Sequence, residues 1–181
     1  MELIVMLDQA TYNHSVRVQK LALALGSSLG LDKSQLASLS TGALLHDLGK
    51  HKIPADILFK PEGLTRDERE VMENHPVFGW EITKHFDLEP AIAEIVLHHH
   101  LWYNGQGGYP HINSEDRPSL LAQITTVADV IDAMTEDRPY RKGLSIQTSF
   151  DFLLEGSGSR FNPALVDCAL HTLDHMPFVA S

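Results

Sequence analysis

The sequence of 181 residues contains a single cysteine, Cys168. One cysteine excludes an internal disulfide framework and a metal site built from thiolates. The chain is long enough to bury a core without such cross-links, and its length favours one domain over residues 1–181. We therefore expect a fold that is held by packing, in a reducing, cytoplasmic setting.

Long hydrophobic runs are missing as well. No apolar run reaches the roughly 20 residues that a membrane-spanning helix needs. Near its start the chain carries Glu2 where a secretory signal would carry positive charge, and a small-residue cleavage pattern is lacking. We expect no membrane segment.

Basic residues are scarce relative to acidic ones. Lys and Arg number 14 against 24 Asp and Glu, so the formal net charge is −10. Such a chain is a poor whole-surface binder of DNA or of an anionic membrane, because both repel an acidic protein. A small basic pocket for a phosphate-bearing ligand stays compatible with this charge.

Histidine, by contrast, is abundant, with 11 residues. Imidazole is a common ligand for divalent metals and titrates near neutral pH, so this composition indicates a metal site or a response to pH. The spacing of the histidines along the predicted elements has to distinguish the two.

Apolar residues follow helical spacing along most of the chain, and no segment alternates strongly with a period of two. Capping-box patterns at 32–35 and 65–68 open two helices. Prolines open others, at positions 76, 90, 118 and 163. The glycine-rich segment 101–117 is a long loop, of a kind that is often functional. The sequence predicts an all-α bundle of seven to eight helices.

His46 and Asp47 are adjacent, and Lys50 follows four residues after His46. This spacing predicts that His46 and Lys50 lie on one face near the end of the same helix. An imidazole binds one metal, whereas a carboxylate has two oxygens and can bridge two metals. An isolated His-Asp pair is more often an ion pair at a helix end, so a metal site needs further ligands.

Further side chains of the metal-binding types lie at the ends or on the apolar faces of other predicted helices: His14, His75, the run His98-His99-His100, and Asp129. Each histidine alone has an ordinary interpretation, as a core residue or a solvated helix end. An aspartate in the apolar segment 124–131 is rarely buried unless it is paired or binds a metal. Together, five helices that each offer a ligand are typical of a dinuclear centre in a helical bundle.

The ordered set of motifs resembles the HD superfamily of metal-dependent phosphohydrolases, and more narrowly its HD-GYP family. The resemblance covers about residues 10–170. The matching elements are His14 with Arg17-Val18, His46-Asp47-Leu48-Gly49-Lys50, Lys60-Pro61, Leu64-Thr65, His75-Pro76, His99-His100, Gly108-Tyr109-Pro110, Asp129 with Asp132-Ala133, and Asp137-Arg138-Pro139-Tyr140-Arg141.

The resemblance implies an all-α HD domain that hydrolyses cyclic di-GMP or a related cyclic dinucleotide with two divalent metals, usually iron or manganese. The ligand types alone also admit nickel or zinc. The implied metal ligands are His14, His46, Asp47, His75, His99, His100 and Asp129. The pair His98 and His99 stays open as an alternative to His99 and His100. In this family the Gly-Tyr-Pro loop is also associated with contacts to cyclic-dinucleotide synthases, which are therefore an implied partner.

Three positions depart from the family pattern. Ala10 stands where members with three metals have a glutamate, so we expect two metals and no third. Leu101 stands where a glutamate usually follows the double histidine, and the loop 105–110 has one glycine more than usual.

Two metals about 3.5–4 Å apart can lower the pKa of a bridging water until hydroxide exists at neutral pH. On this hypothesis the hydroxide attacks the phosphodiester, with Asp47 as the bridging carboxylate. Lys50 then orients a phosphate or protonates the leaving oxygen.

Several residues are candidates for binding the dinucleotide. Arg138 and Arg141 suit phosphate oxygens and guanine edges. Asp132 can accept from a guanine edge or orient a metal ligand. Tyr109 and Trp102 can stack on a base, or pack the glycine-rich loop against the bundle.

Two other functions stay open. One is an HD phosphohydrolase that acts on another nucleotide. The other is a signalling module that binds a nucleotide or a protein with little turnover. The altered glycine-rich loop is compatible with this interpretation.

Overall fold

The structure is a computed structural model, and it describes residues 3–110, 117–137 and 142–173. Over these residues every regular element is a helix, which confirms the all-α prediction. Within them, no helix is long and apolar enough to cross a membrane. Arg138 and Arg141, two of the predicted substrate-binding residues, lie outside the described residues.

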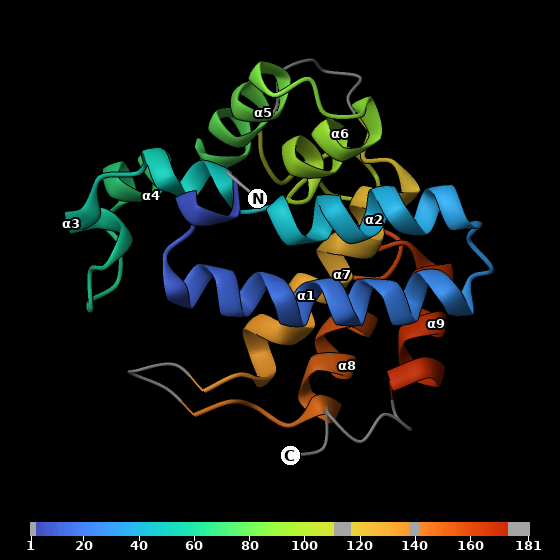
Figure 1. Cartoon of the computed structure of the whole chain (residues 1–181). Coiled ribbons are helices and arrows are strands. Elements are labelled where there is room, and N and C mark those ends of the chain that lie inside the picture. Colours follow the sequence, from blue (N-terminus) through green and yellow to red (C-terminus); the bar gives the residue numbers. More distant parts are fainter. Residues whose placement is uncertain (1–2, 111–116, 138–141, 174–181) are drawn as a thin grey trace.

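Three long helices form the centre of the fold. α1 (Gln9–Ser28) and α2 (Lys33–Leu45) run antiparallel side by side, and α7 (Leu120–Thr135) packs behind them (Figure 1). On one side of these helices lie α5 (His75–His85) and α6 (Pro90–His98), and on the other lie α8 (Ile146–Glu155) and α9 (Pro163–Leu173). The α1–α2 pair therefore separates two groups of shorter helices.

The remaining elements are short. They are the 3-10 helices η1 (Ile4–Met6) and η2 (Leu48–Lys52), together with α3 (Ala55–Leu58) and α4 (Arg66–Met72). In Figure 1, α3 and α4 project beyond the end of α1. All eight predicted helices are present, and the short α3 is an additional one.

Side-chain caps set most of the helix starts. Both predicted capping boxes form, with Asp32 opening α2 and Thr65 opening α4. The hydroxyl of Ser145 accepts from the backbone of Thr148 at the start of α8, as predicted. α7 begins two residues after Pro118, because the hydroxyl of Ser119 accepts from the backbone N–H of Ala122 and caps the helix there.

The prediction that His46 and Lys50 share one helix is wrong. α2 ends at Leu45, and Lys50 belongs to η2. The close approach of η2 to α5 explains the change: a Cβ added at Gly49 would lie 1.8 Å from the carbonyl oxygen of His75. Glycine lets the two backbones touch, and the chain tightens into a 3-10 turn to bring them together.

The apolar core has two parts. The larger one is built from α1, α2, α7, α8 and α9, around residues such as Leu25, Ile124 and Leu165. The smaller one joins the end of α2 and η2 to α5 and α6, around Leu48 and Val96. The histidine-bearing segments belong to elements of both parts, so packing of the two parts fixes how these segments meet.

Candidate metal centre

The seven predicted metal ligands converge from α1, the end of α2, the start of α5, the end of α6 and the middle of α7. Among the described residues, three groups of three have their ligand atoms within 4.8 Å of one another: two share no residue, and the third, His46, Asp47 and His99, connects them. We name His14, His46 and Asp129 the first triad, and His75, His99 and His100 the second triad.

Asp47 lies between the triads. Its Oδ2 atom is 3.4 Å from Nε2 of His46 and 3.7 Å from Nε2 of His14, in the first triad. Its Oδ1 atom is 3.3 Å from Nε2 of His75, in the second. One carboxylate therefore offers an oxygen to each side, which is the arrangement that a bridging ligand requires.

Three of the histidine rings are aimed by the main chain. Nδ1 of His46, His75 and His99 each donates to the carbonyl oxygen of the third residue before it, at 2.7–2.9 Å: Ala43, Met72 and Val96. A carbonyl only accepts, so the proton of each ring sits on Nδ1. The Nε2 atoms point into the cluster, as is usual for histidines that bind a metal.

The Nε2 atoms of His75 and His99 lie 3.2 Å apart. Burial lowers the pKa of both rings, that of His75 to about 3, so they are neutral and neither Nε2 carries a proton to share. Nε2 of His46 is also buried, with no hydrogen-bond partner among the described residues. Buried lone pairs that face one another fit a cation and are otherwise costly, so the donor set fits a divalent metal.

His14 differs from these rings because carboxylates hold both of its nitrogens. Nδ1 lies 2.7 Å from Oδ2 of Asp132, and Nε2 lies 3.1 Å from Oδ1 of Asp129. Burial opposes a charge on the ring, but the hydrogen bonds and charges of these carboxylates outweigh it and raise the pKa of His14 to about 10. A metal at the first triad would therefore displace a proton from Nε2.

Lys50 reaches the cluster although it does not share a helix face with His46. Its Nζ donates to Oδ2 of Asp47 at 2.6 Å. Burial alone would raise the pKa of Asp47, but the positive charge of Lys50 beside it lowers this pKa well below its usual value. Asp47 is therefore ionised at neutral pH.

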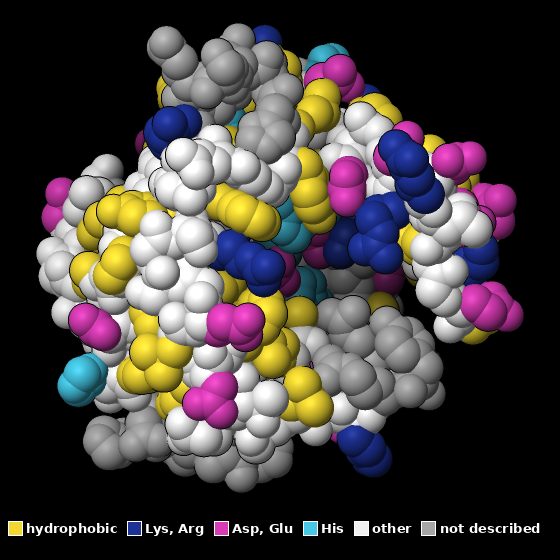
Figure 2. Space-filling view, turned by 180° about the vertical axis from the view of Figure 1, so that it is seen from behind, with side chains coloured by type: hydrophobic (Ala, Val, Ile, Leu, Met, Phe, Trp, Pro, Cys, Tyr) yellow, Lys and Arg dark blue, Asp and Glu magenta, His cyan; other side chains and the backbone are white. Residues whose placement is uncertain are grey.

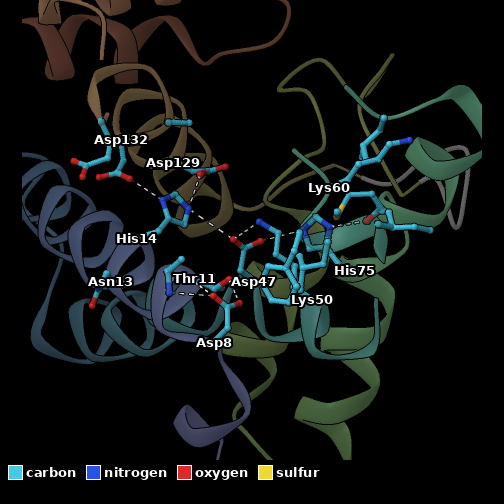
Figure 3. A pocket seen from close by; sticks show the side chains of 18 of the residues that line it. Asp8, Thr11, Asn13, His14, Asp47, Lys50, Lys60, His75, Asp129 and Asp132 are labelled. Atoms are coloured by element: carbon cyan, nitrogen blue, oxygen red, sulfur yellow. Dashed lines mark hydrogen bonds and ion pairs between the residues drawn. The ribbon is translucent and has the colours of Figure 1, made fainter. Parts of the chain in front are cut away.

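A cleft of about 940 Å³ opens over the cluster. Figure 2 shows histidine side chains at the bottom of a hollow with lysine or arginine side chains on either side. In Figure 3, His14, Asp129 and Asp132 lie on one side, and Lys50, His75 and Lys60 lie on the other. The cleft is large enough for a nucleotide-sized ligand.

Comparison with known proteins agrees with this geometry. The family model described as an HD domain matches residues 1–165. This chain belongs to the HD domain family. The match confirms the family predicted from the motifs.

Two curated relatives are cyclic di-GMP phosphodiesterases by name. One, from Pseudomonas aeruginosa, is 36% identical over 157 residues, which cover 86% of this chain and 37% of the relative. The other is the response regulator RpfG of Xanthomonas campestris, 35% identical over 165 residues that cover 90% of this chain and 43% of the relative. This HD domain therefore spans less than half the length of either relative.

A solved structure has the same fold. It is an HDGYP protein from Bdellovibrio bacteriovorus, with a TM-score of 0.73 and 22% sequence identity, and the match covers 91% of this chain and 52% of that one. The similarity supports the HD fold of the chain.

Within the HD domain, the structure favours His99 and His100 over His98 and His99 as the predicted ligand pair. The ring of His100 packs on that of His99, with centroids 4.1 Å apart, and belongs to the second triad. His98 points elsewhere, and its Nδ1 pairs with Oε1 of Glu94 at 3.0 Å.

Trp102 and Tyr109, the two predicted base-stacking residues of the glycine-rich loop, have different environments. Tyr109 lines the cleft and packs on His100, with ring centroids 4.5 Å apart. Trp102 lies under the guanidinium of Arg160, and a Cβ added at Gly107 would be 2.5 Å from its ring. The structure therefore favours packing of the loop as the role of Trp102.

The positions that depart from the family pattern are accommodated locally. Leu101 is 1% exposed and belongs to the apolar core, where a carboxylate would be desolvated. Ala10 lines the cleft near His14 and offers no ligand atom.

Sequence reasoning noted Arg17 only as part of a motif, and it gave Asp132 two possible roles. In the structure the guanidinium of Arg17 binds both carboxylate oxygens of Asp132, which also holds His14. This favours the orienting role for Asp132 over guanine binding. The i, i+3 spacing of His14 and Arg17 on one helix was the available signal. Lys60, which also lines the cleft, was noted only within the Lys60-Pro61 motif, and its neighbour Phe59 gave no signal.

Proposed function

We propose that this HD domain is a metal-dependent phosphodiesterase that hydrolyses cyclic di-GMP or a related cyclic dinucleotide. The observation that carries the proposal is the placement of Asp47 between two triads of ligand atoms, under a cleft of about 940 Å³. The names of the curated relatives point to the same substrate class.

Two divalent metals, iron or manganese, are the proposed cofactors, with His14, His46 and Asp129 holding one and His75, His99 and His100 the other. When bound, such a pair supplies Lewis acidity and a water of lowered pKa. No third metal is proposed, because Ala10 provides no ligand.

The residues of the chain have separate tasks in this proposal. Asp47 offers one oxygen to each triad, and main-chain carbonyls keep the rings of His46, His75 and His99 in place. Lys50, whose ammonium Asp47 holds at the cleft, orients a phosphate oxygen or gives a proton to the leaving oxygen.

Substrate binding is assigned to the rest of the cleft. Tyr109 lies beside His100, where a base can stack on its ring. Asp132 lines the same cleft but acts mainly through His14. Arg138 and Arg141 keep the phosphate- or guanine-binding role that the sequence predicts.

Two further parts of the proposal rest on the sequence. The chain acts as one catalytic domain over residues 1–181 in the cytoplasm, and its Gly108-Tyr109-Pro110 loop contacts a cyclic-dinucleotide synthase.

The proposal is tested by anaerobic metal analysis joined to a hydrolysis assay. Wild type and Asp47→Ala are reconstituted with iron or manganese and given a panel of cyclic dinucleotides and linear nucleotides. We expect two metals per wild-type chain and turnover of a cyclic dinucleotide, with turnover lost in Asp47→Ala. Equal turnover by the two proteins would overturn the mechanism. Nucleotide binding without hydrolysis by the metal-loaded wild type would favour a signalling module instead.

A further inference from the structure

His14 is held in a different way from three of the other histidines. Main-chain carbonyls fix Nδ1 of His46, His75 and His99, whereas Nδ1 of His14 donates to a side chain, Oδ2 of Asp132, at 2.7 Å. A side-chain partner fixes a ring only as well as the partner is itself fixed. The orientation of His14 therefore depends on what holds Asp132.

Arg17 holds Asp132 with a two-point contact. Nε of Arg17 lies 2.6 Å from Oδ1 of Asp132, and Nη2 lies 3.0 Å from Oδ2. This paired geometry fixes both the position and the plane of the carboxylate. The side chain of Asp132 is 5% exposed and that of Arg17 is 36% exposed, so the contact closes one edge of the cleft.

The four residues form a closed link between two helices. His14 and Arg17 lie three residues apart on α1, and Asp129 and Asp132 lie three residues apart on α7. His14 and Asp129 offer atoms to the first triad. Asp132 bonds the ring of His14, and Arg17 bonds Asp132. The carbonyls that fix His75 and His99, in the second triad, belong to other segments, at Met72 and Val96.

We propose that Arg17 and Asp132 are a positioning pair that sets the metal affinity of the first triad alone. The pair acts through His14 and leaves the second triad, in which main-chain carbonyls fix the rings of His75 and His99, unaffected. The proposal rests on the proposed metal centre.

Loss of Arg17 leaves Asp132 without the contact that fixes its plane, and the ring of His14 gains freedom to turn. Removing a hydrogen-bonding partner of a metal ligand typically lowers metal affinity by about 10–100-fold. Because Arg17 acts on His14 through Asp132, we expect a loss toward the lower end of this range at one of the two metal positions.

The test is a titration of chelator-treated, anaerobic protein with Mn²⁺, followed by calorimetry and by metal analysis after dialysis. We expect wild type to bind two Mn²⁺ per chain. In Arg17→Ala one Mn²⁺ should bind as in wild type and the other more weakly, toward the lower end of the range of about 10–100-fold. Arg17→Lys keeps the charge but loses the two-point contact with Asp132, so its weaker Mn²⁺ affinity should lie between those of wild type and Arg17→Ala. Arg66→Ala removes an exposed ion pair with Glu70 on α4 and should bind as wild type does.

Combining Arg17→Ala with a second substitution shows which of the two metal positions it weakens. In His100→Ala, which damages the second triad, Arg17→Ala should further weaken the Mn²⁺ that still binds. In His14→Ala, which removes the ring through which the pair acts, Arg17→Ala should have no further effect on Mn²⁺ affinity. A purely structural link between α1 and α7 would change urea unfolding of the metal-free protein and leave these affinities unchanged.

The outcomes separate this proposal from the one on which it rests. A wild type that binds less than one Mn²⁺ per chain contradicts the metal centre itself. If wild type binds two, the positioning pair alone is overturned when Arg17→Ala binds both normally, when it weakens both equally, or when its effect persists in His14→Ala.

Discussion

Oδ1 of Asp47 lies 3.3 Å from Nε2 of His75, across the contact between η2 and α5. This distance depends on Gly49, two residues after Asp47. A Cβ at Gly49 would lie 1.8 Å from the carbonyl oxygen of His75 and 2.5 Å from the backbone nitrogen of Gly79. The position of Asp47, the proposed bridging carboxylate, against the second triad is thus set by a backbone contact that only glycine permits.

Gly49→Ala should therefore destabilise the protein and weaken metal binding together. Forcing a methyl group against backbone atoms typically costs roughly 1–3 kcal/mol, and here it also moves Asp47 away from His75. Urea unfolding and Mn²⁺ titration measure the two effects. Gly63→Ala is the matched control, because a Cβ at Gly63 meets no atom within 4 Å. Equal metal affinity in the two variants would contradict the proposed role of this contact.

Lys50→Met should separate catalysis from metal binding. Losing a proton donor or phosphate-orienting group lowers turnover by about 10²-fold or more. The seven proposed ligands are kept, but Asp47 loses its hydrogen bond from Lys50, so turnover is measured per bound metal at saturating Mn²⁺. Steady-state hydrolysis and metal analysis of the same sample provide the measurement.

The matched control for Lys50 lies on the same 3-10 helix. Lys52 is 45% exposed and pairs with Glu81 on α5, away from Asp47. Lys52→Met should keep wild-type turnover. If the two lysine variants hydrolyse the substrate equally well, Lys50 has no special part in the reaction.

The metal-free protein should lose stability on both sides of neutral pH. The pKa values of buried His75 and His100 lie at about 3 and about 4 in the folded state, below the usual 6.5, so the unfolded chain takes up protons first as the pH falls below 6.5. Between pH 6.5 and 5 each of these two histidines should lower the free energy of unfolding by about 2 kcal/mol.

On the alkaline side the sign is reversed. The pKa of His14 is raised to about 10, so its contribution to stability is complete below pH 6.5 and is lost as the pH rises toward 10. Urea unfolding of the chelator-treated protein at pH 5, 6.5 and 9 measures the loss of stability on the acid side and on the alkaline side. Stability that does not fall between pH 6.5 and 5 would contradict neutral, buried histidines.

Leu101→Glu restores the side chain that the family usually has at this position, and it should destabilise this protein. Leu101 is 1% exposed, and a charge without a partner at a buried site costs about 3–5 kcal/mol. Leu154→Glu, at a leucine that is 48% exposed on α8, should change stability by less than about 0.5 kcal/mol. Thermal unfolding of both variants makes the comparison, and a stable Leu101→Glu protein would show that the loop has room for the carboxylate.

Much of the fold could be predicted from local signals. The capping boxes at Asp32 and Thr65 form as predicted, and the cap at Ser145 opens α8. These signals are local, because a cap and the backbone N–H that it binds lie within three residues of each other. One exception is the end of α2, where the tertiary contact at Gly49 replaces helix by a 3-10 turn.

The sequence by itself determined the family, the all-α class and the side-chain types of the proposed metal centre, because ordered motifs and helical spacing are present along one chain. Tertiary structure decided where these side chains point and which partners they have. It turned His98 toward Glu94 and His100 toward the second triad, and it joined Arg17 to Asp132. These orientations and contacts depend on which helix faces meet and on the direction in which each ring is held. Both are set by packing between segments distant in sequence, which no spacing within one segment reveals.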